Sequence, residues 1–222
     1  MTSLLTRALA EALGTLLLLA CVVGSGVMGV ALSQGNDGVA LLANAAATAG
    51  ILYVLIVVMG PVSGGHFNPA VSLVEHLRGR LSPAAFAAYV GAQLVGAVAG
   101  VVLAHAMFGL DLVQAGTHAR TGPSQWLSEG VATFGLLLTI GLGVKRRPAA
   151  VPALVACYIF AAYWFTASTS FANPAVTVAR SLTTSFAGIR PLDVGGFVAV
   201  QLVGALLAMP VVRLLGRDNA SG

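Results

Sequence analysis

Six long apolar stretches, each almost free of charged residues, run through the chain between shorter polar or glycine-rich segments. Each reaches about the 20 residues that an α-helix needs to cross the hydrocarbon core of a bilayer. The pattern therefore predicts six membrane-spanning helices near residues 8–32, 39–60, 83–107, 124–144, 149–167 and 195–214. The first stretch is too long for the apolar core of a signal peptide and contains Glu11, so we expect it to be a retained span.

The composition favours a membrane protein over a water-soluble domain. Hydrophobic residues make up 58% of the 222 residues and charged residues only 8%, whereas about 25% of an ordinary soluble domain is charged. The 11 Lys and Arg residues outnumber the 7 Asp and Glu residues. They stand at the ends of the predicted spans and not on a basic face interleaved with aromatics, which argues against nucleic acid as a partner.

Basic residues are shared unevenly between the two sides of the predicted spans, and short cytoplasmic loops hold the excess in membrane proteins. One side carries Arg7, Arg78, Arg80, Lys145, Arg146, Arg147, Arg213 and Arg217, and the other carries Arg120, Arg180 and Arg190. We therefore expect a multi-pass protein of the cell (inner) membrane with both termini in the cytoplasm.

Two connections, 60–82 and 167–193, are too apolar for solvent-exposed loops and too short for another full span. Each contains an Asn-Pro-Ala motif: Asn68, Pro69 and Ala70 in the first, and Asn173, Pro174 and Ala175 in the second. Asparagine favours the capping position of a helix and proline favours its first turn. A helix of about eight to ten residues covers only about half of the hydrocarbon core. Because irregular backbone at that depth must be buried in protein or line a water-filled cavity, we predict two re-entrant half-helices beside a pore or binding site.

The two halves of the chain repeat the same features in the same order. The matched features are Glu11 with Glu129, Asn68 with Asn173, and the stretch 91–97 with the stretch 199–205. Three spans per half is an odd number, so the second half enters the membrane from the opposite side and the half-helices meet head to head. We expect a single transmembrane channel domain, residues 1–222, with repeat halves of about 1–115 and 116–222.

Small residues mark one predicted helix contact. Gly96 and Gly100 form a GxxxG pattern in the third span, and Gly96 matches Gly204 in the sixth. Such patterns let two helices approach closely. We therefore expect the third and sixth spans to cross at these glycines.

The paired motifs and the repeat resemble the aquaporin and glycerol-facilitator superfamily, the major intrinsic proteins, over nearly the whole chain. The resemblance implies an all-α membrane protein of six transmembrane helices and two re-entrant half-helices in an hourglass-shaped inverted repeat. It also implies a homotetramer in the lipid bilayer with one pore per subunit, a passive channel for small uncharged solutes, and no cofactor. Facing half-helix N-termini concentrate positive potential that repels cations. The amides of Asn68 and Asn173 would donate to passing oxygens, unless they only cap their helices.

Two carboxylates and one histidine within or beside the predicted spans are candidate structural or pore residues. Glu11 and Glu129 are carboxylates at membrane depth, where an unpaired charge is costly, so each needs donors or a cavity. In the family, matched glutamates accept from backbone N–H groups of the re-entrant loops; a proton relay in a coupled carrier is the alternative. His66 matches the family's pore-wall histidine, and a histidine satisfied within the core is the other interpretation.

The family spacing places four residues at the outer constriction, which selects the solute: Thr48, Ala161, Ser170 and Val176. Most relatives carry an arginine at the position of Val176 and an aromatic residue or histidine at another of the four. The departure predicts a wider and less polar ring, and resembles bacterial channels associated with arsenic resistance, whose implied substrates are metalloid hydroxides such as arsenous acid. Arg180 lies one helical turn beyond Val176. It is either a displaced pore arginine of the outer vestibule or a partner for Asp111 or lipid headgroups.

These residues predict a passive channel for metalloid hydroxides, glycerol and water. An ordinary water and glycerol channel without metalloid specialisation is one alternative. A secondary carrier is another, because such carriers also contain inverted repeats and broken helices. We find no nucleophile paired with a base, and His76, His105 and His118 lack a regular metal-ligand spacing, so we expect neither an enzyme nor a metal site.

Overall fold

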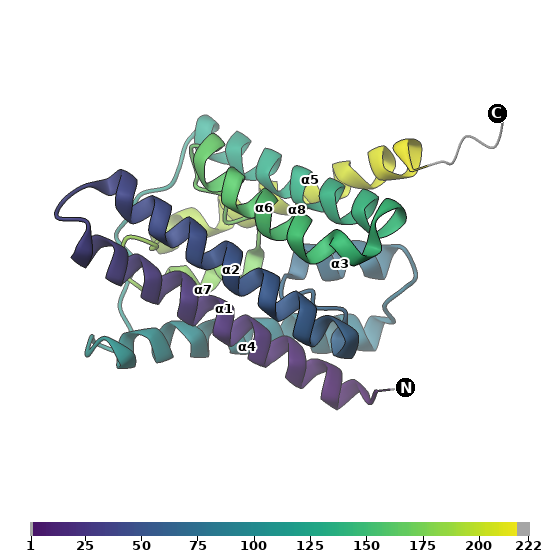
Figure 1. Ribbon diagram of the computed structural model, residues 1–222, viewed down its shortest axis with the longest axis horizontal. Helices are drawn as coiled ribbons and strands as arrows, with labels where there is room; N and C mark the ends of the chain where they lie inside the picture. Colours follow the sequence, from purple (N-terminus) through teal and green to yellow (C-terminus); the bar gives the residue numbers. More distant parts are fainter. Residues whose placement is uncertain (1, 217–222) are drawn as a thin grey trace.

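The computed structural model describes residues 2–216, which form eight α-helices and no strand (Figure 1). The helices are α1 (Leu4–Leu32), α2 (Asp37–Ser63), α3 (Pro69–Leu77), α4 (Pro83–Met107), α5 (Pro123–Arg146), α6 (Val151–Phe165), α7 (Pro174–Arg180) and α8 (Val194–Leu215). Short 3₁₀ turns, η1 (Pro148–Ala150) and η2 (Pro191–Asp193), lead into α6 and α8. Arg217, one of the basic residues used above to predict orientation, lies outside the described residues.

Six of these helices, with η1 and η2 counted as part of α6 and α8, are long and apolar enough to cross a membrane, which confirms the predicted spans. The remaining two, α3 and α7, have 9 and 7 residues and begin at the prolines of the two Asn-Pro-Ala motifs. The first span begins and the last span ends at the same end of the molecule (Figure 1), as an even number of crossings requires. We call this end the terminal end and the opposite one the far end.

Within each half, the first long helix packs most extensively against the third: α1 against α4, and α5 against α8. Glycines make this possible, since a Cβ atom on Gly96 would lie 2.2 Å from the carbonyl oxygen of Ala12. A Cβ atom on Gly204 would lie 2.3 Å from the carbonyl oxygen of Gly130. The predicted crossing of the third and sixth spans is therefore wrong. Each glycine instead lies in a helix contact inside its own half. The prediction failed because a small residue indicates close approach of two helices but does not specify the partner helix.

Candidate functional site: the cavity between the half-helices

A cavity of about 280 Å³ passes the N-termini of both half-helices. Side chains of α1, α2, α5 and α6 supply most of its wall. The irregular segments that precede α3 (residues 64–67) and α7 (residues 166–172) also line it, and we call them the first and second lead-ins. At the terminal end the wall includes Glu75 and Arg80, and at the far end it includes Phe171 and Arg180. The helices α4 and α8 supply no lining residue and pack against the half-helices from outside.

Each motif asparagine caps its own half-helix and also holds the opposite lead-in. The Oδ1 atom of Asn68 accepts from the backbone N–H of Ala70 at 2.9 Å, and that of Asn173 accepts from Ala175 at 3.0 Å. The Nδ2 atom of Asn68 donates to the carbonyl of Ala172 at 2.8 Å, and that of Asn173 donates to the carbonyl of Phe67 at 2.8 Å. A carboxamide has two N–H groups. Each asparagine, which lines the cavity, therefore retains one N–H for a solute.

Glu11 is fully buried and accepts four hydrogen bonds. Its Oε1 atom accepts from the Ser63 hydroxyl at 2.6 Å and the His66 backbone N–H at 2.9 Å, and its Oε2 atom accepts from the Phe67 backbone N–H at 2.6 Å and Gln93 Nε2 at 2.8 Å. All four donors belong to the first half of the chain, and two of them are backbone groups of the first lead-in.

Glu129 has the same arrangement in the second half and is also fully buried. It accepts from the backbone N–H groups of Phe171 at 2.8 Å and Ala172 at 2.9 Å, and from Gln201 Nε2 at 2.7 Å. The cavity wall includes neither carboxylate. Both instead face backbone that would otherwise leave buried donors unsatisfied.

The glutamates also stabilise strained backbone. Phe67 and Ala172 have φ angles of 49° and 47°, a left-handed conformation that is uncommon for residues other than glycine and costs about 1–3 kcal/mol. The N–H of each donates to a glutamate, and the C=O of each accepts from the opposite asparagine. The strain thus turns two carbonyl groups toward the centre of the molecule.

Gln93 and Gln201 are buried positioning residues to which sequence reasoning assigned no role. Gln93 donates to Glu11 and to the Ser72 hydroxyl at 3.0 Å, and Gln201 donates to Glu129 and to the Thr177 hydroxyl at 2.8 Å. Each therefore joins a glutamate to a half-helix. The signal was present, because both glutamines stand at the same place in the repeated stretches 91–97 and 199–205.

His66 lines the cavity in its terminal half. Its Nδ1 atom lies 3.0 Å from the Ser72 hydroxyl, and its ring meets the ring of Tyr89 edge to face at a centroid distance of 5.3 Å. These contacts fix the ring against the wall and leave the imidazole accessible to the cavity.

Three of the four residues predicted for the outer constriction line the cavity: Thr48, Ser170 and Val176. Ala161 does not, and it is exposed on the outer surface of α6. The α6 residues that line the cavity are spaced four apart, namely Val151, Val155, Ile159 and Tyr163. A position two residues from Tyr163 is rotated by about 200° on a helix and faces away. We therefore correct the predicted ring by replacing Ala161 with Tyr163.

This correction changes the chemistry of the ring. Tyr163 is 3% exposed, and its hydroxyl lies 3.2 Å from the Thr48 hydroxyl across the cavity wall. The ring therefore contains an aromatic side chain, which the family spacing had not placed there. The Ser170 hydroxyl is buried and has no hydrogen-bond partner within residues 2–216.

Arg180 is 2% exposed, and its guanidinium lines the far end of the cavity. Its Nε atom donates to the carbonyl of Ala187, and its Cζ atom lies 3.3 Å from the centroid of the Phe171 ring. Within the described residues no carboxylate pairs with it, so Asp111 is not its partner. The geometry matches the displaced pore arginine better than the surface alternative.

Arg120 shares the Phe171 ring with Arg180, at 4.9 Å from the ring centroid. It donates to the carbonyls of Gly188 at 2.9 Å and Ser168 at 3.0 Å, and so holds the second lead-in. Burial lowers the pKa of Arg120, although the negative charge of Glu129 acts in the opposite direction. Sequence reasoning used Arg120 only to predict the orientation and gave it no role at the site.

Comparison with known proteins agrees with this architecture. The family model described as major intrinsic protein matches residues 1–165. The aquaglyceroporin AqpS of Rhizobium meliloti (strain 1021) is 58% identical over 209 residues, which cover 94% of this chain and 89% of that protein. Aquaporin Z of Brucella melitensis is 27% identical over 97% of this chain and 100% of its own. Among solved structures, the aquaglyceroporin from Plasmodium falciparum aligns with a TM-score of 0.77 at 17% identity, covering 96% of this chain and 100% of that one, which supports the fold alone.

Proposed function

The chain belongs to the major intrinsic protein family and is a multi-pass membrane channel, not an enzyme; from this premise we propose that it conducts neutral, hydroxyl-bearing solutes, namely metalloid hydroxides such as arsenous acid in addition to glycerol and water. The observation that carries the proposal is the ring of Thr48, Tyr163, Ser170 and Val176. This ring has no guanidinium at the position of Val176 and has three hydroxyl groups.

The hydroxyls suit a solute that carries several O–H groups. A buried hydroxyl without a partner costs about 1–3 kcal/mol, and a solute that bonds Ser170 in transit removes that cost. One N–H each from Asn68 and Asn173 would then donate to an oxygen of the same solute deeper in the pore. Every one of these groups is neutral, so bonds to a passing solute form and break readily.

Arg180 would act from one turn farther out. Its guanidinium lines the cavity beside Phe171, where it would repel cations and donate to solute oxygens without narrowing the ring at Val176. We expect Arg180→Gln to alter the ratio of glycerol to water permeability. The matched control is Arg190→Gln, an arginine of the same end that pairs with Asp193 at 2.9 Å outside the cavity. Unchanged permeability to glycerol and water in Arg180→Gln would show that Arg180 has no role in permeation.

Uptake of arsenous acid and glycerol into proteoliposomes at neutral pH tests the proposed function. We expect fast, non-saturating uptake compared with protein-free vesicles, and suppression of it by Val176→Arg, which restores a guanidinium inside the ring. Val176→Met is the matched control for added length without charge. Rapid water flux with arsenous acid uptake no faster than in empty vesicles would show a water pore without metalloid specialisation. Saturable uptake driven by a proton or sodium gradient would show a carrier.

The assembly and orientation follow the same proposal. We infer a homotetramer in the inner membrane, with the terminal end of each subunit in the cytoplasm, because most of the basic residues gather at that end. Chemical cross-linking in native membranes tests the subunit number. Accessibility of single cysteines at Thr2 and at Thr117 to an impermeant thiol reagent, in a variant lacking Cys21 and Cys157, tests the orientation.

A further inference from the structure

The terminal end holds a second pocket, of about 510 Å³, beside the mouth of the pore. Four cationic side chains from three segments line it, and its remaining wall is apolar. The cations are Arg78, Arg80, Lys145 and Arg213, and the apolar residues are Met209, Pro210 and Val212. We call it the basic pocket.

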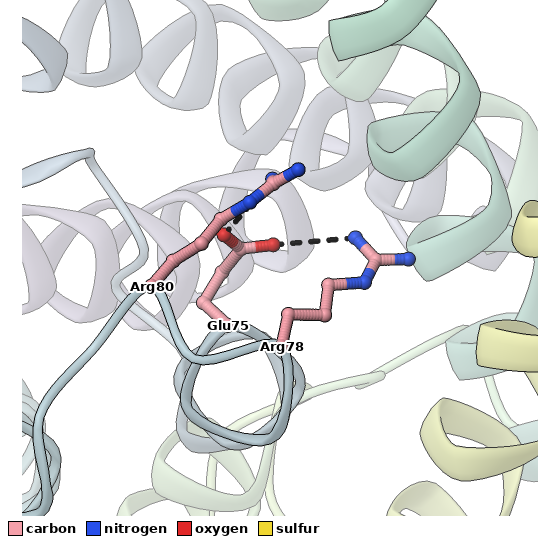
Figure 2. Close-up of polar contacts among 3 residues, drawn as sticks. All are labelled: Glu75, Arg78 and Arg80. Atoms are coloured by element: carbon pink, nitrogen blue, oxygen red, sulfur yellow. Dashed lines mark hydrogen bonds and ion pairs between the residues drawn. The ribbon is translucent and has the colours of Figure 1, made fainter.

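One carboxylate contacts this set of cations. Glu75 lies between Arg78 and Arg80, and each guanidinium meets a different carboxylate oxygen at 3.3 Å (Figure 2). These distances exceed the 2.7–2.9 Å of a strong charge-assisted bond. Each arginine has further N–H donors, because a guanidinium carries five.

The other two cations have no ion-pair partner within residues 2–216. Lys145 donates to the carbonyl of Gly216 at 3.1 Å, which uses one of its three N–H groups. Arg213 stands in the last turn of α8 and is exposed. Among residues 2–216 the pocket therefore combines four positive charges with one negative charge, an arrangement that favours an anion.

The pocket lies at the ends of two membrane spans, the level at which the phosphates of a bilayer are expected. Lys145 and Arg213 occupy the last turns of two membrane spans, α5 and α8, at the terminal end. Basic pockets between the ends of spans bind anionic headgroups. The volume of the pocket is larger than a free phosphate ion needs, and such an ion would make no use of the apolar residues. Both features suit the glycerol and the first acyl carbons attached to a lipid phosphate.

We propose that the basic pocket binds the phosphate group of an anionic phospholipid. The guanidinium group of an arginine can donate two parallel hydrogen bonds to the oxygens of one phosphate, and Lys145 adds a further positive charge. A bound phosphate competes with Glu75 for Arg78 and Arg80. Because Arg80 also lines the mouth of the pore, the pocket and the pore share one side chain. The proposal depends on the membrane position of the chain and not on which solute the pore conducts.

Native mass spectrometry of the protein extracted with defined lipids tests the site. We expect phosphatidic acid to bind in preference to phosphatidylcholine. Lys145→Gln and Arg213→Gln should each weaken the binding of phosphatidic acid about fivefold, the factor expected for one basic side chain near an anionic membrane surface. The matched control is Arg147→Gln, which removes an exposed cation two residues beyond Lys145 and outside the pocket; we expect less than a twofold change.

Three results would overturn the assignment. One is equal weakening by Arg147→Gln, which would show diffuse attraction to the surface. Another is no preference for the anionic lipid in the unmodified protein. The third is binding of glycerol 3-phosphate, measured by titration calorimetry, as tight as that of phosphatidic acid, which would assign the pocket to soluble phosphate esters. Equal thermal unfolding midpoints in phosphatidylcholine verify that each exposed substitution leaves the fold intact.

Discussion

The substitution Glu129→Gln tests whether the buried carboxylates hold the pore together. Glu129 accepts three hydrogen bonds at 2.7–2.9 Å and is fully buried. Bonds to a charged acceptor contribute about 1.5–3 kcal/mol each, whereas neutral ones contribute about 0.5–1.5 kcal/mol. A glutamine also turns one acceptor into an N–H₂ group, which leaves at least one buried backbone donor facing another donor, at a cost of about 1–3 kcal/mol.

A neutral amide is cheaper to bury than a carboxylate, which offsets part of this loss. We therefore expect a net loss of about 2–4 kcal/mol in the free energy of unfolding. For a chain of this length that corresponds to a fall of roughly 5–15 °C in the unfolding midpoint. Glu11→Gln should cost at least as much, because Glu11 accepts four bonds.

Permeation should fall together with stability. Without Glu129, Ala172 is free to leave its φ of 47°, and its carbonyl then turns away from the Nδ2 atom of Asn68. Thermal unfolding in detergent and stopped-flow water flux in proteoliposomes measure the two effects on one preparation. Asp111→Asn is the matched control, because it makes the same chemical change on an exposed loop side chain. Glu129→Gln with a midpoint within about 2 °C of the parent and parental flux would refute the reasoning.

Other substitutions test the ring, the helix contacts and the loop between α4 and α5. Tyr163→Ala should raise the ratio of glycerol to water permeability severalfold in stopped-flow light scattering, whereas Ala161→Val on the opposite face of α6 should leave it unchanged. Gly204→Ala should lower the unfolding midpoint by roughly 5–10 °C, because its Cβ atom would lie 2.3 Å from a backbone oxygen of α5. Gly91→Ala is the control and should leave the midpoint unchanged, because no atom outside its own helix lies within 4 Å of the added Cβ atom. Partial burial and nearby arginines lower the pKa of His118, so the unfolded chain binds more protons at mildly acid pH. The free energy of unfolding should therefore fall as the pH drops below about 6.5, and His118→Gln should weaken this dependence in thermal unfolding scans.

The spans and half-helices were predictable because each rests on a local physical rule. Length and the absence of charge identify a helix that crosses a bilayer, and asparagine followed by proline identifies where a helix begins. The structure places α3 and α7 at the prolines that these rules indicated. No knowledge of distant contacts was needed for either result.

The rotation of α6 was not predictable in the same way. Nearly every residue of α6 is apolar, so its hydrophobic pattern does not distinguish a pore face from a lipid face. Counting back from Asn173 crosses the second lead-in, where Thr169 and Ser170 have φ angles of 60° and 50°, and a count across such backbone does not preserve helical phase. The four-residue spacing that ends at Tyr163 became meaningful only once the cavity was located.

The hydrogen-bond network also bears on the choice between a channel and a proton-coupled carrier. A relay needs a carboxylate that exchanges protons with the transport pathway. Glu11 and Glu129 are fully buried and absent from the cavity wall, and all four of their oxygens accept hydrogen bonds from fixed donors.

Protonating either glutamate would break bonds to the very backbone whose carbonyls hold the two asparagines. The two carboxylates thus have a structural role: they hold the lead-ins at the N-terminal ends of α3 and α7. Over the central and far parts of the cavity, the polar side chains that face a solute are neutral amides, hydroxyls and Arg180. Those parts of the wall bind hydroxyl groups weakly and contain no carboxylate that could couple a proton gradient to transport.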